Sequence, residues 1–320
     1  MCGIAGISNL TPITRRMIPH ILWDIETRGR DSWSATDGTS LIKHLGPATL
    51  SYAGSADEID SWDRVILHTR AASTGAVTLE NQHPFRFDRP NPADGHILGI
   101  HNGIVGNHLD LKIEHNRDFE VDSMHIFAHI AAGLDTKDIC GWGNLAWYDF
   151  CPDFPSGVLR LLRFNSEALH IATLLTGELI FCSTKETIFR AAAMAGGRVD
   201  KFLTIHDETL YTIRQDETGT WQCFFRTGEK MPFGPKTSYV SSDYRDWNNY
   251  SYTPHQNTID LTGMGSSHRN RPTRMTFALL GADDRKEGIC AVRACKKQVV
   301  GSRRQALICP DHVMEVMKSL

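Results

Sequence analysis

The first regular pattern in the chain is a helical one, close to its beginning. Between residues 11 and 27 the apolar side chains recur every three or four positions, at Met17, Ile18, Ile21, Leu22 and Ile25. This spacing places them on one face of a helix, and the glycine at position 29 interrupts the pattern. The sequence therefore predicts an amphipathic helix followed by a turn over residues 28–32.

Shorter apolar segments of a different kind follow this helix. Residues 41–52, 65–71 and 96–105 are bounded by glycine or proline and rich in β-forming residues, which predicts three strands. A second helix is predicted to begin at Asp122 or Ser123, since either side chain can cap it, and to end at Gly133.

Three closely spaced apolar segments then predict a meander of strands over residues 158–164, 168–175 and 178–182. After them, Ser183 and Glu186 have the spacing of a capping box, which predicts a helix that ends at Gly196 and Gly197. Strands and helices joined by short links, without regular strand-helix alternation, predict an α+β fold of packed antiparallel sheets with helices on their outer faces.

The length and composition are those of a globular protein. The chain has 320 residues, of which 41% are hydrophobic, and no apolar run approaches the roughly 18 residues that span a bilayer. A charged segment followed by an apolar stretch, typical of a secretory signal, is absent from the start of the sequence, so we predict a cytoplasmic protein without membrane association. The eight cysteines are accordingly expected to be reduced.

The composition changes along the chain and predicts three regions. Residues 1–226 hold the periodic segments, and residues 227–274 are mostly small, polar or proline, as in a linker or irregular extension. Residues 275–320 are predicted to form a small basic module. Between positions 268 and 304 the chain carries ten Lys or Arg but three Asp or Glu, although the net charge of the whole chain is −3.

The chain begins Met1-Cys2-Gly3, and the position of this cysteine has chemical consequences. Removal of Met1 would make Cys2 the first residue, so that a thiol and a free α-amino group belong to the same residue. Because an α-amine has a pKa near 8, a fraction of it is neutral at pH 7 and accepts the proton of an attacking thiol. The sequence thus predicts a nucleophile that carries its own base.

Six short stretches, in this order and with these separations, resemble the glutaminase domain of class II glutamine amidotransferases. These are members of the N-terminal nucleophile hydrolases, and the resemblance covers about residues 2–215. The stretches are Cys2-Gly-Ile-Ala-Gly6, Arg28-Gly-Arg-Asp-Ser32, His68-Thr-Arg-Ala-Ala-Ser-Thr-Gly75, Asn81-Gln-His-Pro84, His101-Asn-Gly103 and Val121-Asp-Ser123.

The resemblance implies a role for residues in each part of the site. Cys2 would attack the side-chain amide of L-glutamine and pass through a thioester, while the Asn102 amide and the Gly103 N–H would face the oxyanion. Arg70 would bind the substrate α-carboxylate and Asp122 its α-ammonium.

Other residues would support this site. Arg28 and the turn around Asp31 would position the Cys2 segment, and Ser73 and Thr74 would lie in a loop that closes over glutamine. The chain departs from the family at Ala71, where a bulky aromatic residue is common, and at Met124, where an acidic residue is common. The histidines at 68, 83 and 101 are interpreted as structural, since the α-amine is the expected base.

The resemblance also implies a four-layer αββα sandwich of two antiparallel sheets and a glutaminase reaction without an organic cofactor. Beyond residue 210 we find no phosphate-binding Gly-x4-Gly-Lys-Ser/Thr loop, so the expected ammonia acceptor is a separate synthase protein. Two other hypotheses remain open at the sequence level. One is a free-standing amidohydrolase that acts on another small amide, and the other is a non-catalytic scaffold.

The last region contains a possible metal site. Cys290, Cys295, Cys309 and His312 have the spacing C-x4-C-x13-C-x2-H, and three thiolates with one imidazole suit tetrahedral structural Zn²⁺. The alternative is that they are ordinary buried cysteines beside a surface histidine. The surrounding arginines and lysines are compatible with weak contact to nucleic acid or to an acidic partner, or with a solvated face.

Overall fold

The computed structural model describes residues 1–215 and 221–236, and the predicted zinc module and most of the predicted linker lie outside these residues. The described strands form two sheets in which all paired strands are antiparallel. The predicted α+β class with two antiparallel sheets is therefore confirmed.

The first sheet has seven strands in the order β11-β9-β10-β1-β4-β2-β3. Its strands are β1 (Gly3–Ser8), β2 (Ser32–Thr36), β3 (Leu41–Leu45), β4 (Arg64–Arg70), β9 (His170–Leu174), β10 (Leu179–Cys182) and β11 (Val199–Thr204). Strand β1 lies in the middle of this sheet, paired with β10 on one side and with β4 on the other.

The second sheet has six strands in the order β13-β12-β8-β7-β6-β5. They are β5 (Phe85–Asp88), β6 (His96–Val105), β7 (Gly141–Cys151), β8 (Phe154–Phe164), β12 (Thr209–Gln215) and β13 (Trp221–Lys230). Strand β13 extends past residue 226, where the sequence predicts the end of the first region. Phe233 then stacks on Phe164 of β8, with ring centroids 4.0 Å apart.

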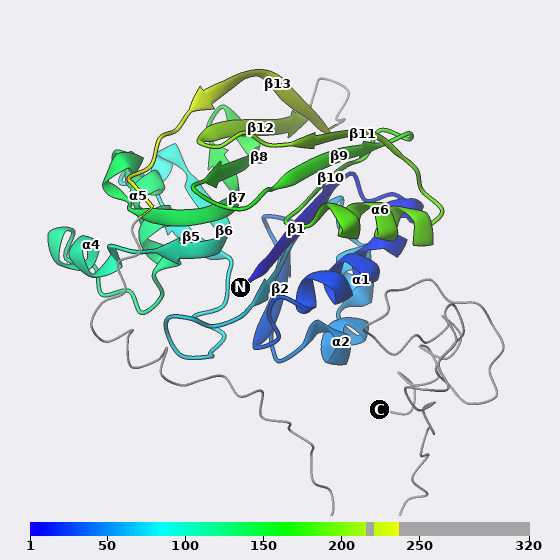
Figure 1. The fold of residues 1–320 in the computed structure, drawn as a ribbon, viewed down its shortest axis with the longest axis horizontal. Helices are drawn as coiled ribbons and strands as arrows, with labels where there is room; N and C mark the ends of the chain where they lie inside the picture. The colour runs from blue at the N-terminus through cyan, green and yellow to red at the C-terminus, as the bar shows by residue number, and fades with distance from the viewer. Residues whose placement is uncertain (216–220, 237–320) are drawn as a thin grey trace, which may run out of the picture. The chain divides into compact units, whose positions relative to one another are not determined.

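Three clusters of buried side chains set the order of the layers. The first joins helices α1 (Pro12–Glu26) and α6 (Lys185–Met194) to one face of the seven-stranded sheet. The second lies between the two sheets, and the third joins α5 (Ser123–Ala132) to the outer face of the six-stranded sheet. Figure 1 shows the resulting sequence of helices, sheet, sheet and helix from right to left.

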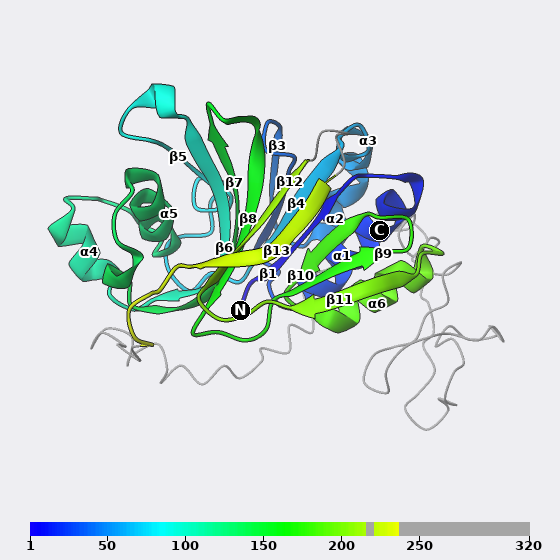
Figure 2. The same cartoon turned by 90° about the horizontal axis from the view of Figure 1, so that it is seen from above.

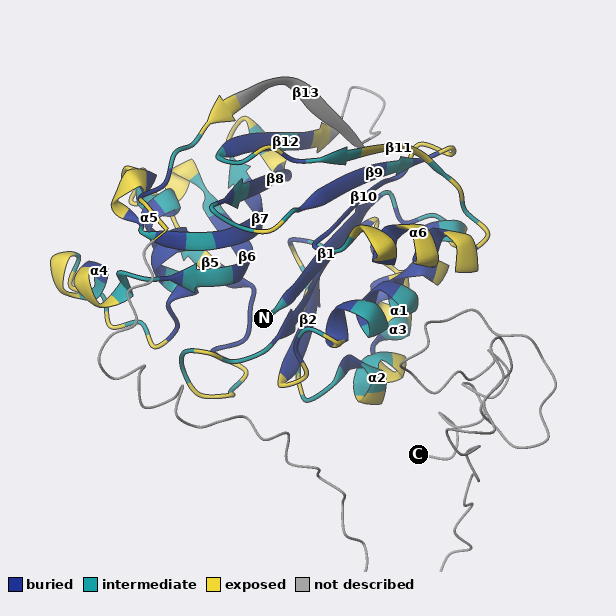
Figure 3. Cartoon of the chain, viewed as in Figure 1, coloured by how far each residue is buried: buried dark blue, intermediate teal, exposed yellow. Residues whose placement is uncertain are grey.

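The remaining helices are short, and three of them add one buried side chain each to these clusters, namely Ala48, Ile59 and Leu111. These helices are α2 (Ala48–Ser51), α3 (Ala56–Asp60), α4 (His108–Glu114) and the 3-10 turns η1 (Tyr52–Gly54), η2 (Pro92–Asp94) and η3 (Thr136–Asp138). The same cartoon turned by 90° shows α4 beside α5 (Figure 2). Coloured by burial, α6 combines a buried and an exposed side and α4 is exposed over most of its length, whereas the central strands are buried along their length (Figure 3).

The local sequence explains where the main helices begin and end. Helix α1 starts with Thr11 as N-cap in a capping box with Thr14, and Pro12 follows at the first helical position, where it costs no hydrogen bond. Helix α5 ends at Gly133, which adopts the left-handed conformation with φ 68°. The predicted helices over residues 11–27 and 123–133 are confirmed, as is the strand over residues 96–105.

The predicted meander of three strands is wrong. Strand β8 pairs with β7 and β12 in the six-stranded sheet, whereas β9 and β10 pair with each other in the seven-stranded sheet. The chain passes from one sheet to the other after β8, through a turn in which Asn165 has φ 50°. Short segments with similar apolar periodicity do not reveal which sheet they enter, because both sheets bury them in the same cluster.

Two smaller predictions are also wrong. The predicted strand over residues 41–52 stops at Leu45, because Gly46 has φ 83° and Pro47 then leads into the short helix α2. The predicted capping box at Ser183 is not formed. Thr184 occupies the N-cap position of α6, while the Ser183 hydroxyl accepts a hydrogen bond from the Ile4 N–H (3.4 Å).

Candidate active site

Cys2 lies at the open end of the central strand of the seven-stranded sheet. It precedes β1, and because Gly3 pairs with Thr69 in antiparallel register, Cys2 lies beside Arg70 at the end of β4. Its Sγ is 3.7 Å from the carbonyl oxygen of Ala71, and its own carbonyl accepts a 3.0 Å hydrogen bond from Arg28 Nε. The cysteine is thus held through its backbone as well as through its strand.

The residue after Cys2 must be glycine for steric reasons. A Cβ atom at Gly3 would lie 2.6 Å from Ile25 Cβ and 2.7 Å from Thr69 Oγ1. These distances are shorter than van der Waals contact, so any side chain would push β1 away from α1 or β4. In contrast, Met1 is 60% exposed.

Charged groups of opposite sign surround the Cys2 thiol. Burial raises the pKa of this thiol above its ordinary value, and the positive charge of Arg70 lowers it while the carboxylate of Asp122 raises it again. The pKa of the thiol is therefore raised overall, and attack by sulfur requires a nearby group that accepts the thiol proton.

Arg70 is 2% exposed and organises the loop that follows it. Its guanidinium donates to the carbonyl oxygens of Ala76 (3.0 Å) and Thr74 (2.7 Å). Within this loop Ser73 is exposed and Thr74 is half-buried. The loop therefore curls around the arginine, and the same guanidinium is electrostatically coupled to both Cys2 and Asp122.

Two carboxylates hold this loop from outside. Asp31 Oδ2 accepts a 2.8 Å hydrogen bond from the Ala72 N–H, and Glu120 Oε1 accepts one of 2.6 Å from the Ala76 N–H. The turn around Asp31 thus contacts the loop after β4, while Arg28 contacts Cys2 itself.

Asn102 and Gly103 belong to β6 of the other sheet. Asn102 is two residues from Ile100, which packs between the sheets, so the alternation of a strand directs the Asn102 side chain to the same face. Asn102 is 3% exposed, and its Oδ1 atom is buried without a hydrogen-bond partner in the described part of the chain. His68 Nε2 lies 3.3 Å from the His101 carbonyl oxygen and links this strand to β4.

Gly103 packs against the neighbouring strand β7. A Cβ atom at this position would lie 2.0 Å from the carbonyl oxygen of Trp142. We expect that Gly103→Ala will separate β6 from β7 locally, lower the free energy of unfolding by about 1–3 kcal/mol and displace Asn102. Thermal unfolding of this variant, compared with Gly54→Ala, where φ is not positive and a Cβ atom would have no neighbour within 4 Å, measures the effect. Equal midpoints would contradict this expectation.

Asp122 occupies the N-cap position of α5, but its carboxylate makes no capping hydrogen bond to the helix and binds the backbone of the sheet instead. Its Oδ2 accepts a 2.8 Å hydrogen bond from the Val105 N–H at the end of β6, and it is 4% exposed. The next side chain, Ser123 Oγ, lies 2.8 Å from His101 Nδ1. Asp122 is therefore a buried acidic group that is fixed to the strand carrying Asn102.

Two residues to which the sequence assigned no role in the site support these groups. Gln82 Nε2 lies 3.2 Å from His68 Nδ1, and its Oε1 accepts a hydrogen bond from Ser32 Oγ. Ser183 contacts the backbone of β1, as described above. Gln82 belongs to the Asn81-Gln-His-Pro84 stretch, but nothing in the sequence shows that its partners are on β2 and β4.

Three buried histidines lie behind the site and predict a pH dependence of stability. Burial lowers the pKa of His68 to about 3 and of His101 to about 4, and that of His83 falls well below its usual value. An unfolded chain binds these protons near pH 6.5, so stability is full above that pH. It declines as the pH falls toward 4, by about 1.4 kcal/mol per pH unit for each histidine.

We expect His83→Phe to reduce this dependence, because both ring nitrogens of His83 are buried without a partner in the described residues. Urea unfolding at several pH values between 7.5 and 5 should show a smaller loss of stability than in the unmodified protein. The exposed His206 offers a matched control, His206→Phe. An unchanged slope in His83→Phe would contradict the assignment.

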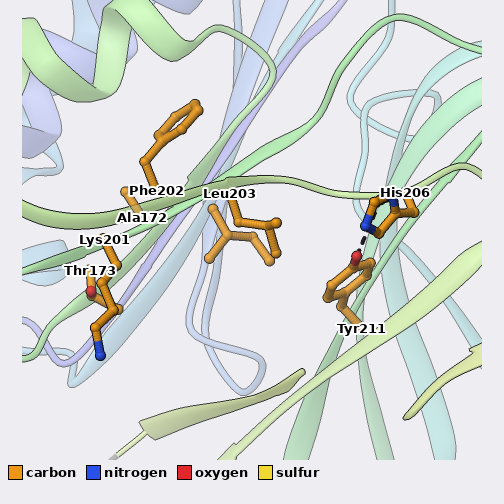
Figure 4. Close-up of a pocket in the computed structure, with 8 residues that line it drawn as sticks. Ala172, Thr173, Lys201, Phe202, Leu203, His206 and Tyr211 are labelled. Atoms are coloured by element: carbon orange, nitrogen blue, oxygen red, sulfur yellow. Dashed lines mark hydrogen bonds between the residues drawn. The ribbon is translucent and has the colours of Figure 1, made fainter. Parts of the chain in front are cut away.

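Other features of the described residues do not belong to this site. A cavity of about 460 Å³ between β9, β11 and β12 is lined mainly by apolar side chains, where the Tyr211 hydroxyl accepts a hydrogen bond from the His206 N–H (Figure 4). No helix in residues 1–215 and 221–236 is long and apolar enough to cross a membrane. Within the same ranges, no group of three or more side chains is arranged to hold a metal ion.

The predicted zinc ligands are not tested by this structure. Cys290, Cys295, Cys309 and His312, together with the basic residues around them, lie outside the described residues.

Comparison with known proteins shows that part of the chain is similar in sequence to glutamine-dependent aminotransferases. No family model matches it. The glutamine–fructose-6-phosphate aminotransferase of Streptococcus pneumoniae strain R6 is 27% identical over 228 residues, which are 68% of this chain and 36% of that protein. The enzyme of the same name from Encephalitozoon cuniculi is 34% identical over 131 residues, 35% of this chain and 18% of that protein.

The matched parts therefore span between about a fifth and just over a third of these curated relatives. Among solved structures, the glutamine phosphoribosylpyrophosphate amidotransferase of B. subtilis has a TM-score of 0.49 and 19% identity. The match covers 70% of this chain and 49% of that chain.

The described residues thus form two facing antiparallel sheets with helices on their outer faces, and Cys2 lies at the end of the central strand of one sheet. The sequence matches show distant homology of this chain to the class II glutamine amidotransferase part of the aminotransferases named above.

Proposed function

We propose that this domain hydrolyses L-glutamine to glutamate and ammonia through a thioester on Cys2. The observation that carries the proposal is the strand register that places Cys2, at the start of the central strand β1, beside the buried Arg70 at the end of β4. The buried Asp122 carboxylate acts on the charge of both groups. A free amino acid carries one group of each opposite charge, so Arg70 and Asp122 are complementary to its two ends.

In the proposed complex, Arg70 donates hydrogen bonds to the substrate α-carboxylate and Asp122 accepts them from the α-ammonium. The γ-amide then extends toward Cys2. Because Arg70 also holds the carbonyls of Thr74 and Ala76, binding of the carboxylate and closure of the loop carrying Ser73 and Thr74 are linked.

The chemistry starts with removal of Met1, which makes the α-amine of Cys2 the base. This amine accepts the thiol proton, and sulfur attacks the amide carbon. Negative charge develops on the amide oxygen, where the Asn102 side-chain amide and the Gly103 N–H donate to it. When the tetrahedral intermediate collapses, the α-ammonium returns its proton to the amide nitrogen, the carbon–nitrogen bond breaks and ammonia leaves. Water then hydrolyses the thioester to glutamate and restores the Cys2 thiol.

Labelling with a diazo-ketone analogue of glutamine tests the proposal directly. The full-length protein, with removal of Met1 verified by intact mass, is expected to incorporate one label at Cys2, and excess glutamine should prevent it. Peptide mapping identifies the labelled thiol. Absence of label, or label shared with Cys140 and Cys151, would overturn the assignment of the nucleophile.

We also propose that the ammonia passes to an acceptor bound by a separate synthase protein. The similarity to aminotransferases, which use glutamine nitrogen for a product, supports transfer rather than simple hydrolysis. Copurification of the tagged protein from its own cells, followed by assay for glutamine-dependent amination of the partner's substrate, tests this step. Glutamine hydrolysis that no partner stimulates would contradict it.

A further inference from the structure

Three polar residues lie side by side across the six-stranded sheet at the level of the proposed oxyanion site. The antiparallel register pairs Asn102 of β6 with Asn144 of β7, and Asn144 with Arg163 of β8. Directly opposed residues on neighbouring strands have their Cβ atoms about 4.5–5.5 Å apart on the same face. The three side chains therefore form a continuous row.

This row faces the space between the sheets. Each member is two residues from an apolar side chain that packs there, and these neighbours are Ile100, Ala146 and Leu161. The row thus continues the inner face of the sheet toward the end of β1, where His68 links the His101 carbonyl to the other sheet.

The two asparagines have unused hydrogen-bonding capacity. Asn102 and Asn144 are 3% and 2% exposed, and in the described residues the Oδ1 atom of each is buried without a partner. A buried acceptor without a donor costs about 1–3 kcal/mol, so an arrangement that satisfies both is favoured. Arg163 lies next to them with its side chain 22% exposed and its Nε 3.4 Å from Asp207 Oδ1.

The donors and acceptors of these side chains determine in which direction hydrogen bonds can run along the row. An asparagine amide has an oxygen that accepts and a nitrogen that donates, and rotation by 180° exchanges them, whereas arginine only donates. A donor from Arg163 to Asn144 Oδ1 leaves Asn144 Nδ2 directed at Asn102. In such an arrangement Asn144 Nδ2 would donate to Asn102 Oδ1, and Asn102 would present its own Nδ2 to the substrate.

We propose that Asn144 and Arg163 are positioning residues that fix the amide orientation of Asn102, so that it offers N–H groups and not its oxygen to the oxyanion. This inference rests on the proposed glutaminase function. In this proposal Asn102 contacts the oxyanion, whereas Asn144 and Arg163 affect the reaction only by fixing the orientation of the Asn102 amide.

The direction of these proposed hydrogen bonds predicts which Asn144 variant has the lower kcat, and loss of packing alone does not predict the same order. In Asn144→Ala the orientation of Asn102 is no longer imposed, whereas in Asn144→Asp it is reversed, because a carboxylate only accepts and draws the Asn102 N–H groups toward itself. We expect the kcat for glutamine hydrolysis to fall in Asn144→Asp by about 10²- to 10³-fold, the loss of one oxyanion donor. Asn144→Ala should lose less, and KM should stay unchanged in both.

The arginine has a conservative variant and a matched control. Arg163→Lys keeps a donor and should retain more kcat than Arg163→Met. Arg160 is on the same strand, its side chain is also 22% exposed and it pairs with one aspartate, Asp149, at 3.2 Å. It faces the other side of the sheet, and Arg160→Met should therefore leave kcat near that of the unmodified protein.

The experiment measures kcat and KM for all five variants, together with thermal midpoints and the rate at which iodoacetamide alkylates Cys2. Alkylation involves no oxyanion, so an equal rate shows that the pocket is intact. The relay is overturned if Asn144→Asp is at least as active as Asn144→Ala, or if Arg160→Met loses as much kcat as Arg163→Met. If the unmodified protein neither hydrolyses glutamine nor takes the diazo-ketone, the proposed function fails and the relay fails with it.

Discussion

Replacement of Cys2 by serine is expected to lower the rate of glutamine hydrolysis by roughly 10⁴-fold or more, as loss of a nucleophile does in other enzymes. A serine hydroxyl has a much higher pKa than a thiol, and an α-amine is too weak a base to deprotonate it efficiently. Since Cys2 precedes β1 and contacts its surroundings mainly through backbone atoms, the fold should persist. Steady-state assays and thermal unfolding of the same preparation measure both quantities.

Cys151 offers the matched control. It is another half-buried free thiol, at the end of β7, and Cys151→Ser should keep the activity of the unmodified protein. Residual activity above about one percent in Cys2→Ser would contradict a thioester mechanism. A large loss in Cys151→Ser would show that the assay reports stability instead of chemistry.

Replacement of Arg70 by methionine is expected to affect both binding and folding. Loss of a buried, hydrogen-bonded partner charge costs about 2–5 kcal/mol, which predicts an increase in KM for glutamine of at least about 30-fold. The carbonyls of Thr74 and Ala76 lose their donors as well, so the free energy of unfolding should fall by about 1–3 kcal/mol. Kinetics at several glutamine concentrations and urea unfolding measure these two effects.

Arg64 separates the two contributions. It is buried near the other end of the same strand, β4, and donates to the carbonyl oxygens of Asp37 (2.6 Å) and Ser156 (2.7 Å). Arg64→Met should cost comparable stability without raising KM. If both variants raised KM equally, the carboxylate-binding role of Arg70 would be wrong.

The features that the sequence predicted correctly are those encoded by nearby residues. Helix α1 could be recognised from its apolar face, and α5 from its start near Asp122 and its end at Gly133. The α+β class with packed antiparallel sheets also followed from the order of short segments, whereas strand β1 after Cys2 was not predicted. The correctly predicted features are the parts in which local chemistry and the final fold agree.

The features that it missed depend on partners far away in the chain. Strand β2 contains Ser32 and Ser34, which are buried because they contact Gln82, and no local pattern marks such polar residues as interior. Strand β7 was also not predicted, and it too contains buried polar residues, Asn144 and Asp149. The assignment of β8 and β9 to different sheets depends on strand pairing between segments that are distant in the sequence. The row formed by Asn102, Asn144 and Arg163 exists only once that pairing is known.

The central place of β1 has a consequence for how this site can move. All six of its residues are buried and it is paired along both edges, so its amide protons should exchange only when the whole domain unfolds. The sulfur is therefore attached to the most rigid part of the molecule. Any opening and closing needed to admit a substrate and release a product must occur in the segment after β4, which is tethered through Arg70, Asp31 and Glu120.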